Sequence, residues 1–338
     1  MKKKNIIKKL LSVVLSAATV FSLLTLPAHA IVPGEDAVTD SPNIVWHDLN
    51  TGVITPMDIE GEYVFAFNEV IDSDFSDYMS PQQIIPPDSR EPVDPADDPY
   101  SGILLITQFI DNNGDSIVDE FAIGTGFMLT ERIMMTAMHC ISPKLDGEEA
   151  YTMQTRVYQG VSLDIEELIG KPVSQHSALE FKNKLEQLVD DHYLSPVEIS
   201  ILEYDANYFY SDNVKYDWCI AVLDSELDCY TFQIQDTIIG EMTAELTGYP
   251  EDHMFGMYKA TGSIMGVTVY GEVYHNIDAY DGQSGSPIYA PTTATNSFPY
   301  IVYAIHTGNL NNDQTIYRAC PITDIIIQAK LRAEAEVE

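Results

Sequence analysis

From Tyr100 onward, the chain is built of short apolar runs that Gly, Pro, Asn and Asp interrupt. Ile103–Ile106, Phe127–Leu129 and Ile301–Ile305 each have the length of a single strand. Runs this short, bounded by turn residues, are typical of β-strands rather than of alternating strands and helices. The pattern predicts an all-β fold, either a barrel or a sandwich.

Two segments depart from this pattern and predict helices. Residues 177–190 place apolar side chains on one helical face, and Ser177 with Glu180 has the form of a capping box. The residues of that face are Ala178, Phe181, Leu185 and Leu188. The second predicted helix runs from Thr323 to Glu338 and ends in solvated charge.

The first ninety residues have a different texture. Residues 1–30 carry five lysines, then an apolar stretch and Ala28-His29-Ala30, which predicts a cleaved signal peptide. An uncleaved membrane anchor is the alternative. Residues 31–87 are rich in acids and proline, which predicts a propeptide or a disordered tail.

Charge narrows the range of partners. The 338 residues include 17 Lys and Arg against 52 Asp and Glu, for a formal net charge of −35. Such a chain offers no basic groove for nucleic acid and no electrostatic attraction to an anionic membrane. We therefore expect a secreted, extracellular protein with no nucleic-acid partner and no stable membrane association after signal cleavage.

The cysteines and one acidic loop leave alternatives open. Cys140, Cys219, Cys229 and Cys320 could form two disulfides outside the cell or stay as buried thiols, and their spacing is not that of a zinc site. Residues 111–115 resemble the start of a calcium loop, but Ser116 and Ala122 break the EF-hand pattern. Asn113-Gly114 favours a hairpin turn. We predict no cofactor and no metal site.

Three further segments carry candidate chemistry when they are taken together. They are Thr136–Cys140, which contains His139, the run Tyr216–Leu223, which contains Asp217, and Asp281–Pro287, which contains Ser284. To act as a nucleophile, a serine hydroxyl needs a base whose pKa lies near neutral pH, which histidine provides. A carboxylate hydrogen-bonded to the histidine fixes its tautomer. The chain order His, Asp, Ser is that of the chymotrypsin arrangement, whereas α/β-hydrolases and subtilisins have other orders.

The motifs themselves add a family resemblance. Thr136–Cys140 resembles the Thr-Ala-x-His-Cys motif of chymotrypsin-like serine proteases, and Gly282–Pro287 resembles a variant found in bacterial glutamyl endopeptidases. Leu246–Pro250, Ala304–Gly308 and Asp88–Arg90 are also similar to segments of that family. The resemblance implies a chymotrypsin-like domain over residues 88–338. It would hold two antiparallel six-stranded β-barrels, a helical insertion at about 160–213 and a C-terminal helix.

The resemblance also implies roles for individual residues. His139, Asp217 and Ser284 would be catalytic, and the N–H groups of Gly282 and Ser284 would form the oxyanion hole. The substrate-binding residues would be His306, Thr307, Gly308, Asn309 and Ala279. Ala279 stands where the family usually has Thr or Ser, and the cysteine that pairs with Cys140 upstream in the family is missing. A Cys140–Cys219 disulfide is expected instead, because these cysteines adjoin His139 and Asp217, which the resemblance brings together in the triad.

These observations predict a secreted serine endopeptidase that cleaves after Glu or Asp. We expect a monomer, made as a zymogen and cut between Gln83 and Arg90, with its own propeptide and protein or peptide substrates as partners. A non-catalytic binding protein on the same fold is one alternative. A protease for basic residues, using Asp278, is a weaker one because His306 would repel a Lys or Arg side chain.

Overall fold

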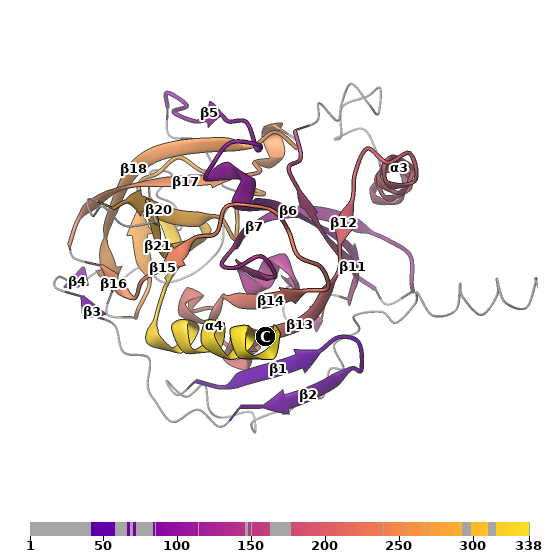
Figure 1. Ribbon diagram of the computed structural model, residues 1–338, viewed down its shortest axis with the longest axis horizontal. Coiled ribbons are helices and arrows are strands. Elements are labelled where there is room, and N and C mark those ends of the chain that lie inside the picture. The colour runs from indigo at the N-terminus through magenta and orange to yellow at the C-terminus, as the bar shows by residue number, and fades with distance from the viewer. Residues whose placement is uncertain are drawn as a thin grey trace, which may run out of the picture.

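The computed structural model describes residues 42–57, 66–67, 70–71, 84, 86–113, 115–145, 148–149, 151–162, 177–238, 240–253, 255–268, 270–292, 299–309 and 316–337. The predicted signal peptide lies outside the described residues, as does most of the segment 58–83. The described chain forms two large β-sheets and two α-helices (Figure 1).

The first sheet is built mainly from the middle of the chain. Its strand order is β12-β11-β6-β7-β8-β14-β13-β1-β2. Residues 196–205 form one nearly continuous strand, assigned as β12 and β13. Its first part, β12, pairs with β11, and its second part, β13, pairs with β14. This change of partner closes six strands into a ring. The strands of this ring are β6 (Ile103–Asp111), β7 (Glu120–Met128), β8 (Ile133–Thr136), β11 (Tyr151–Gln159), β12 (Pro196–Val197) with β13 (Ile199–Asp205), and β14 (Cys219–Leu223).

The second sheet closes into a six-stranded barrel because β21 pairs with β22 as well as with β20. All neighbours around this ring are antiparallel. Its strands are β17 (Met242–Gly248), β18 (Tyr258–Thr268), β19 (Val273–His275), β20 (Pro287–Pro291), β21 (Tyr300–Asn309) and β22 (Tyr317–Pro321). The predicted two-barrel, all-β architecture is confirmed.

A hairpin from the N-terminal segment extends the first sheet. Strand β1 (Ile44–Asp48) pairs antiparallel with β13, and β2 (Val53–Pro56) pairs with β1. Ile44 and Val45 are buried in the main hydrophobic core. Part of the segment predicted as a propeptide is therefore integrated into the sheet, while its proteolytic removal stays a prediction.

The remaining strands are short and complete the edges. They are β3 (Ala66–Phe67), β4 (Val70–Ile71), β5 (Glu91–Pro92), β9 (Lys144–Leu145), β10 (Glu148–Glu149), β15 (Gln233–Ile234) and β16 (Thr237–Ile238). Single 3₁₀ turns occur at Tyr100–Gly102, Met138–Cys140, Ala206–Tyr210, Val214–Tyr216 and Glu251–His253. Two of these turns, at 138–140 and 214–216, carry the site described below.

Both predicted helices are present. Helix α3 (Ala178–Asp190) begins at Ser177, whose Oγ accepts the Glu180 N–H as the capping box predicts, and Phe181 packs 4.1 Å from the ring of Phe121 on β7. Helix α4 (Asp324–Val337) lies beside β14 and above β1 (Figure 1). Strands β12 and β13 fall inside the range 160–213 assigned to the insertion, so only part of that range lies outside the sheet.

Three further expectations bear on the described residues. The expected Cys140–Cys219 disulfide is wrong, because all four cysteines are free thiols and Cys140 Sγ instead donates to the Ser284 carbonyl at 3.2 Å. Asp111 accepts the N–H groups of Asn113 and Ser116, as a polar hairpin turn between β6 and β7 requires. Over the described residues, no group of three His, Cys, Asp or Glu side chains is placed to hold a metal ion.

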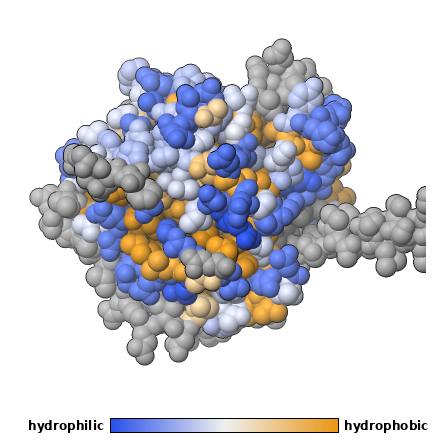
Figure 2. Space-filling model, viewed as in Figure 1, coloured by the Kyte–Doolittle hydropathy of each residue, from blue (hydrophilic) through white to orange (hydrophobic). Residues whose placement is uncertain are grey.

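The surface reflects the composition. Figure 2 shows hydrophilic side chains over much of one face, with apolar side chains gathered towards its middle. No helix among the described residues is long and apolar enough to cross a membrane.

Candidate active site

The pairing of β8 with β14 brings His139 and Asp217 together. Thr136, the last residue of β8, lies opposite Cys219, the first residue of β14. His139 follows β8 in a 3₁₀ turn, and Asp217 caps the 3₁₀ turn that leads into β14. The carboxylate of Asp217 accepts the His139 main-chain N–H at 3.0 Å and contacts Nδ1 at 2.6 Å.

This pair determines the charge state of the imidazole. Burial is the largest single influence and lowers the pKa of His139, but the charge and hydrogen bond of Asp217, together with contributions from Cys140, outweigh it and raise the pKa well above its ordinary value. The His139 side chain is 21% exposed and that of Asp217 is 10% exposed, so the base still reaches solvent. A carboxylate held against Nδ1 stabilises the imidazolium that forms when the neutral ring takes up a proton on Nε2.

Ser284 lies in the tight loop between β19 and β20. Its carbonyl accepts the Thr125 main-chain N–H at 2.8 Å, which ties the loop of the second barrel to β7 of the first. Gly282 and Gly285 have φ angles of 91° and 86°, a conformation that favours glycine. A Cβ at Gly285 would lie 2.0 Å from the Thr125 carbonyl, so the close approach of the two barrels also requires glycine there.

Thr125 and Gln283, to which the sequence motifs assign no role, hold this loop. Thr125 is fully buried, donates its hydroxyl to the Gly282 carbonyl at 3.0 Å and accepts the Tyr249 N–H at 3.0 Å. Gln283 is also fully buried and accepts the Tyr280 N–H at 3.0 Å. Their position in Gly-Thr-Gly and in the serine motif was visible in the sequence, but their hydrogen-bond partners were not.

The N–H groups of the expected oxyanion hole are available. Within the described part of the chain, the main-chain N–H groups of Gly282 and Ser284 donate to no protein acceptor. Ser284 Oγ makes no hydrogen bond to His139 in this structure. Such contacts are often long in a protease without substrate and shorten in the complex.

Four of the expected substrate-binding residues, 306–309, lie on β21, and Ala279 lies in the loop between β19 and β20. His306, Ala279 and Thr307 are buried, and the Thr307 hydroxyl donates to the Arg318 carbonyl at 3.1 Å. His306 links to the serine loop through its main chain, because its carbonyl accepts the Gly285 N–H and its N–H donates to the Ser286 carbonyl. Gly308 and Asn309 continue the same strand towards its end.

Burial determines the charge state of His306 in the substrate-free protein. Burial lowers its pKa well below the ordinary value, and repulsion from His275 and His139 lowers it further. His306 is therefore a neutral imidazole in the substrate-free protein at neutral pH.

Asp278, the residue that a protease for basic side chains would use, is occupied by the N-terminal part of the domain. Its Oδ2 accepts both the N–H of Ser89, at 2.9 Å, and the hydroxyl of Ser89, at 2.5 Å. Arg90 anchors the same segment by a two-pronged contact with Asp252, at 2.8 and 2.6 Å. These contacts disfavour Asp278 as a partner for a substrate Lys or Arg.

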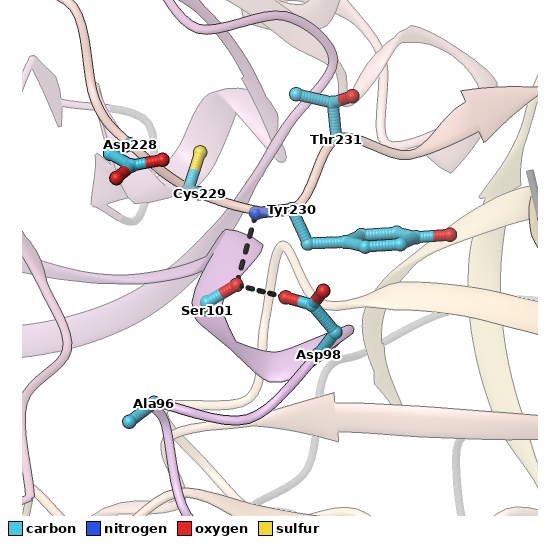
Figure 3. Close-up of a pocket in the computed structure, with 7 residues that line it drawn as sticks. All are labelled: Ala96, Asp98, Ser101, Asp228, Cys229, Tyr230 and Thr231. Carbon is cyan, nitrogen blue, oxygen red and sulfur yellow. Dashed lines mark hydrogen bonds between the residues drawn. The ribbon is translucent and has the colours of Figure 1, made fainter.

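A separate pocket lies away from these residues. It has a volume of about 450 Å³ and is lined by Ala96, Asp98, Ser101, Asp228, Cys229, Tyr230 and Thr231 (Figure 3). Ser101 Oγ donates to Asp98 at 2.8 Å and accepts the Tyr230 N–H at 3.0 Å. Burial, followed by repulsion from Asp228, raises the pKa of Cys229 to about 12, so its thiol is protonated and is a poor nucleophile.

Comparisons with known proteins show the fold. No protein-family model matches the chain, and no curated protein matches it by sequence. A solved glutamyl endopeptidase, "Glu endopeptidase in complex with MPD", superimposes with a TM-score of 0.52 and 18% identity, covering 75% of this chain and 100% of that chain. The protease Anisep from Arthrobacter nicotinovorans gives a TM-score of 0.47 and 13% identity over 70% and 96% of the two chains.

At these identities, the likeness concerns architecture. The chain has the chymotrypsin-like fold, with one barrel that carries His139 and Asp217 and a second that carries Ser284.

Proposed function

We propose that this protein is a serine endopeptidase. Ser284 attacks the peptide carbonyl, His139 takes the serine proton and passes it to the leaving amine, and Asp217 orients and stabilises the imidazolium. The N–H groups of Gly282 and Ser284 bind the oxyanion of the tetrahedral intermediate. Collapse of that intermediate releases the amine product and leaves an acyl-enzyme on Ser284, which water then hydrolyses.

One observation carries the proposal: the 2.6 Å contact between His139 Nδ1 and Asp217, beside a serine loop with two unused N–H donors. The Asp217 contact leaves Nε2 of His139 as the nitrogen that can serve Ser284. Two interbarrel hydrogen bonds to the Ser284 carbonyl, from Thr125 N and Cys140 Sγ, hold the nucleophile beside the turn that carries His139.

For specificity, we propose glutamate as the preferred P1 residue, whose carbonyl is attacked, with aspartate as a further P1 residue. His306 and the main chain of Thr307 and Gly308 would bind the substrate, as the resemblance to glutamyl endopeptidases implies. Ala279 contributes no hydroxyl, so recognition of the P1 side chain depends more heavily on His306.

The biological setting belongs to the same proposal. We propose secretion through the signal peptide in residues 1–30 and synthesis as a zymogen that is cut between Gln83 and Arg90. The expected partners are protein or peptide substrates and the protein's own propeptide, and the expected state is a monomer.

A cleavage-site profile tests the proposal. The purified protein is incubated with a denatured, sequence-diverse protein mixture, and new termini are identified by mass spectrometry, with Ser284→Ala as the control. Cuts that are enriched after Glu and absent with the variant are the expected result. Cuts after unrelated residues would retain the catalytic assignment and overturn the specificity.

Absence of cuts would favour the alternative, a non-catalytic binding protein on a protease fold. Labelling with a fluorophosphonate separates the two, because only an activated serine reacts. A folded protein that is cut between Gln83 and Arg90 and does not label at Ser284 would overturn the protease assignment.

A further inference from the structure

A second histidine lies directly behind His306. His275, the last residue of β19, places Nε2 3.0 Å from Nδ1 of His306 on β21. Both side chains are fully buried, and neither belongs to the His139–Asp217 pair. Tyr317 on β22 completes the cluster: its ring stacks on that of His275, with centroids 5.3 Å apart, and meets that of His306 edge to face, with centroids 5.9 Å apart.

The hydrogen bonds of this cluster determine where the protons are. The main-chain N–H of Ile277 donates to His275 Nδ1 at 3.3 Å. A main-chain N–H can only donate, so Nδ1 of His275 has no proton, and neutral His275 must carry its proton on Nε2. That Nε2–H donates to Nδ1 of His306, so neutral His306 carries its proton on Nε2 in turn.

The surroundings keep both rings neutral. Burial lowers the pKa of His275 to about 3 and that of His306 well below its ordinary value. Burial also raises the pKa of Tyr317 to about 12, so its phenol is uncharged at neutral pH. A proton added to His306 would have to sit on Nδ1, where it would face the Nε2–H of His275.

We propose that His275 is a specificity-positioning residue that holds His306 as a neutral Nε2–H donor, so the pocket selects P1 side chains that carry an acceptor oxygen, glutamine as well as glutamate. This inference rests on the proposed protease function and on the placement of His306 at the P1 side chain. A neutral N–H forms a charge-assisted hydrogen bond with the carboxylate of glutamate and a neutral hydrogen bond with the amide oxygen of glutamine. The two P1 residues then differ in binding free energy only by the difference in strength between these two hydrogen bonds. Glutamate is therefore favoured over glutamine by only about tenfold in kcat/KM.

The first test needs no variant and no activity. In ¹⁵N-labelled protein with its eight histidines, long-range ¹H–¹⁵N spectra distinguish the Nε2–H tautomer, the Nδ1–H tautomer and the imidazolium. We expect both His275 and His306 as Nε2–H tautomers at pH 7. An imidazolium or an Nδ1–H tautomer at His306 would overturn the proposal even if the protein is an active protease.

The second test measures hydrolysis of matched peptides with Glu, Gln or Leu at P1. We expect kcat/KM for Gln within about tenfold of that for Glu, and Leu well below both. A preference for Glu over Gln of a thousandfold or more would contradict a neutral donor.

Two substitutions separate positioning from packing. His275→Phe keeps a ring of similar size but removes the donor, and it should raise KM for Glu and Gln peptides about tenfold with little change in kcat. His275→Gln can donate its amide N–H to His306 and should restore most of that loss. Equal KM for His275→Phe and the unmodified protein would overturn the inference, as would failure of His275→Gln to rescue while Ser284 still labels with fluorophosphonate.

Failure of the protease proposal itself has a different signature. A protein that neither cleaves nor labels at Ser284 refutes the catalytic assignment, whereas one that labels and shows the wrong His306 tautomer refutes only the inference about His275.

Discussion

The two barrels complete their hydrogen bonding in different ways. In the second, β21 pairs with both β20 and β22, so the ring needs no outside strand. In the first, Pro196–Asp205 changes partner from β11 to β14, and β1 takes the side of β13 that this change exposes. An uncovered strand edge invites pairing with other chains. Here a segment from far upstream in the same chain covers it.

The two halves of the candidate site also differ, in the charge that their histidines carry. The first barrel contributes His139 and Asp217, whose carboxylate raises the histidine pKa. The second contributes His275 and His306, which burial keeps neutral and hydrogen bonds orient. One half is organised to accept and stabilise charge, and the other to position donors without charge.

The largest expected effect comes from removing the carboxylate of the His139–Asp217 pair. Asp217→Asn removes the carboxylate that stabilises the imidazolium and favours the wrong tautomer of His139, so kcat should fall about 10⁴-fold with little change in KM. Peptide hydrolysis measures this. The matched control, Asp224→Asn, changes an exposed acid just beyond the other end of β14 and should be neutral. A loss below tenfold for Asp217→Asn would remove Asp217 from the catalytic assignment.

The hairpin of β1 and β2 provides the next test. Ile44 is 1% exposed in β1, and Ile44→Ala should lower the free energy of unfolding by about 2–5 kcal/mol. Val53→Ala in β2, where Val53 is 55% exposed, should change it by less than about 0.5 kcal/mol. Urea unfolding of the full chain measures both. Equal effects would mean that the hairpin contributes little to the first sheet.

Glu203 makes the stability of the pairing between β1 and β13 depend on pH. It lies opposite Trp46 of β1 and pairs with Arg332 of α4 at 2.5 Å, yet burial outweighs that pairing and raises its pKa to about 7. Because the folded state holds this proton more tightly than the unfolded state, its stabilising contribution is complete below the ordinary glutamate pKa. It is lost as pH rises to about 7.

The change amounts to about 3 kcal/mol at most. Glu203→Gln should remove that part of the decrease in unfolding free energy between pH 5 and pH 8, measured by urea titration. An unchanged pH slope in the variant would assign the dependence to other groups.

The smallest expected effect concerns the contact between the barrels. Thr125→Val removes the hydroxyl that serves Gly282 and Tyr249, and should destabilise by about 1–3 kcal/mol while lowering kcat more than it raises KM. Thr155→Val is the control, since that hydroxyl makes only a 3.5 Å contact with Ile141 elsewhere in the first barrel. An equal loss of kcat in both variants would mean that Thr125 has no particular influence on the serine loop.

Local signals explain what could be predicted from the sequence. The capping box at Ser177 and Glu180 and the apolar face around Phe181 are encoded within one helix, and both agree with the structure. The order of His139, Asp217 and Ser284 predicts the chymotrypsin arrangement because serine hydrolases of different folds carry these residue types in different orders along the chain.

What was missed depends on partners distant in sequence. Nothing near Ile44 identifies β13 as its partner, so an acid-rich segment was interpreted only as a propeptide or tail. The function of His275 depends on His306 and on the main chain of Ile277, and its own neighbours carry no motif. The disulfide expectation failed because the contact between His139 and Asp217 does not fix where the thiols of their neighbours Cys140 and Cys219 point.

The long sequence separation between β1 and β13 also affects the order in which the two strands are synthesised. Asn43 and Asp205, joined by a 3.3 Å hydrogen bond at the start of this pairing, are 162 residues apart. A chain synthesised from its N-terminus exposes β1 long before β13 exists, so β1 has no partner strand on that side until most of the first sheet has been synthesised. A single cut between residues 57 and 90 would turn an intramolecular pairing into an association of two chains, whose completeness then depends on their concentration.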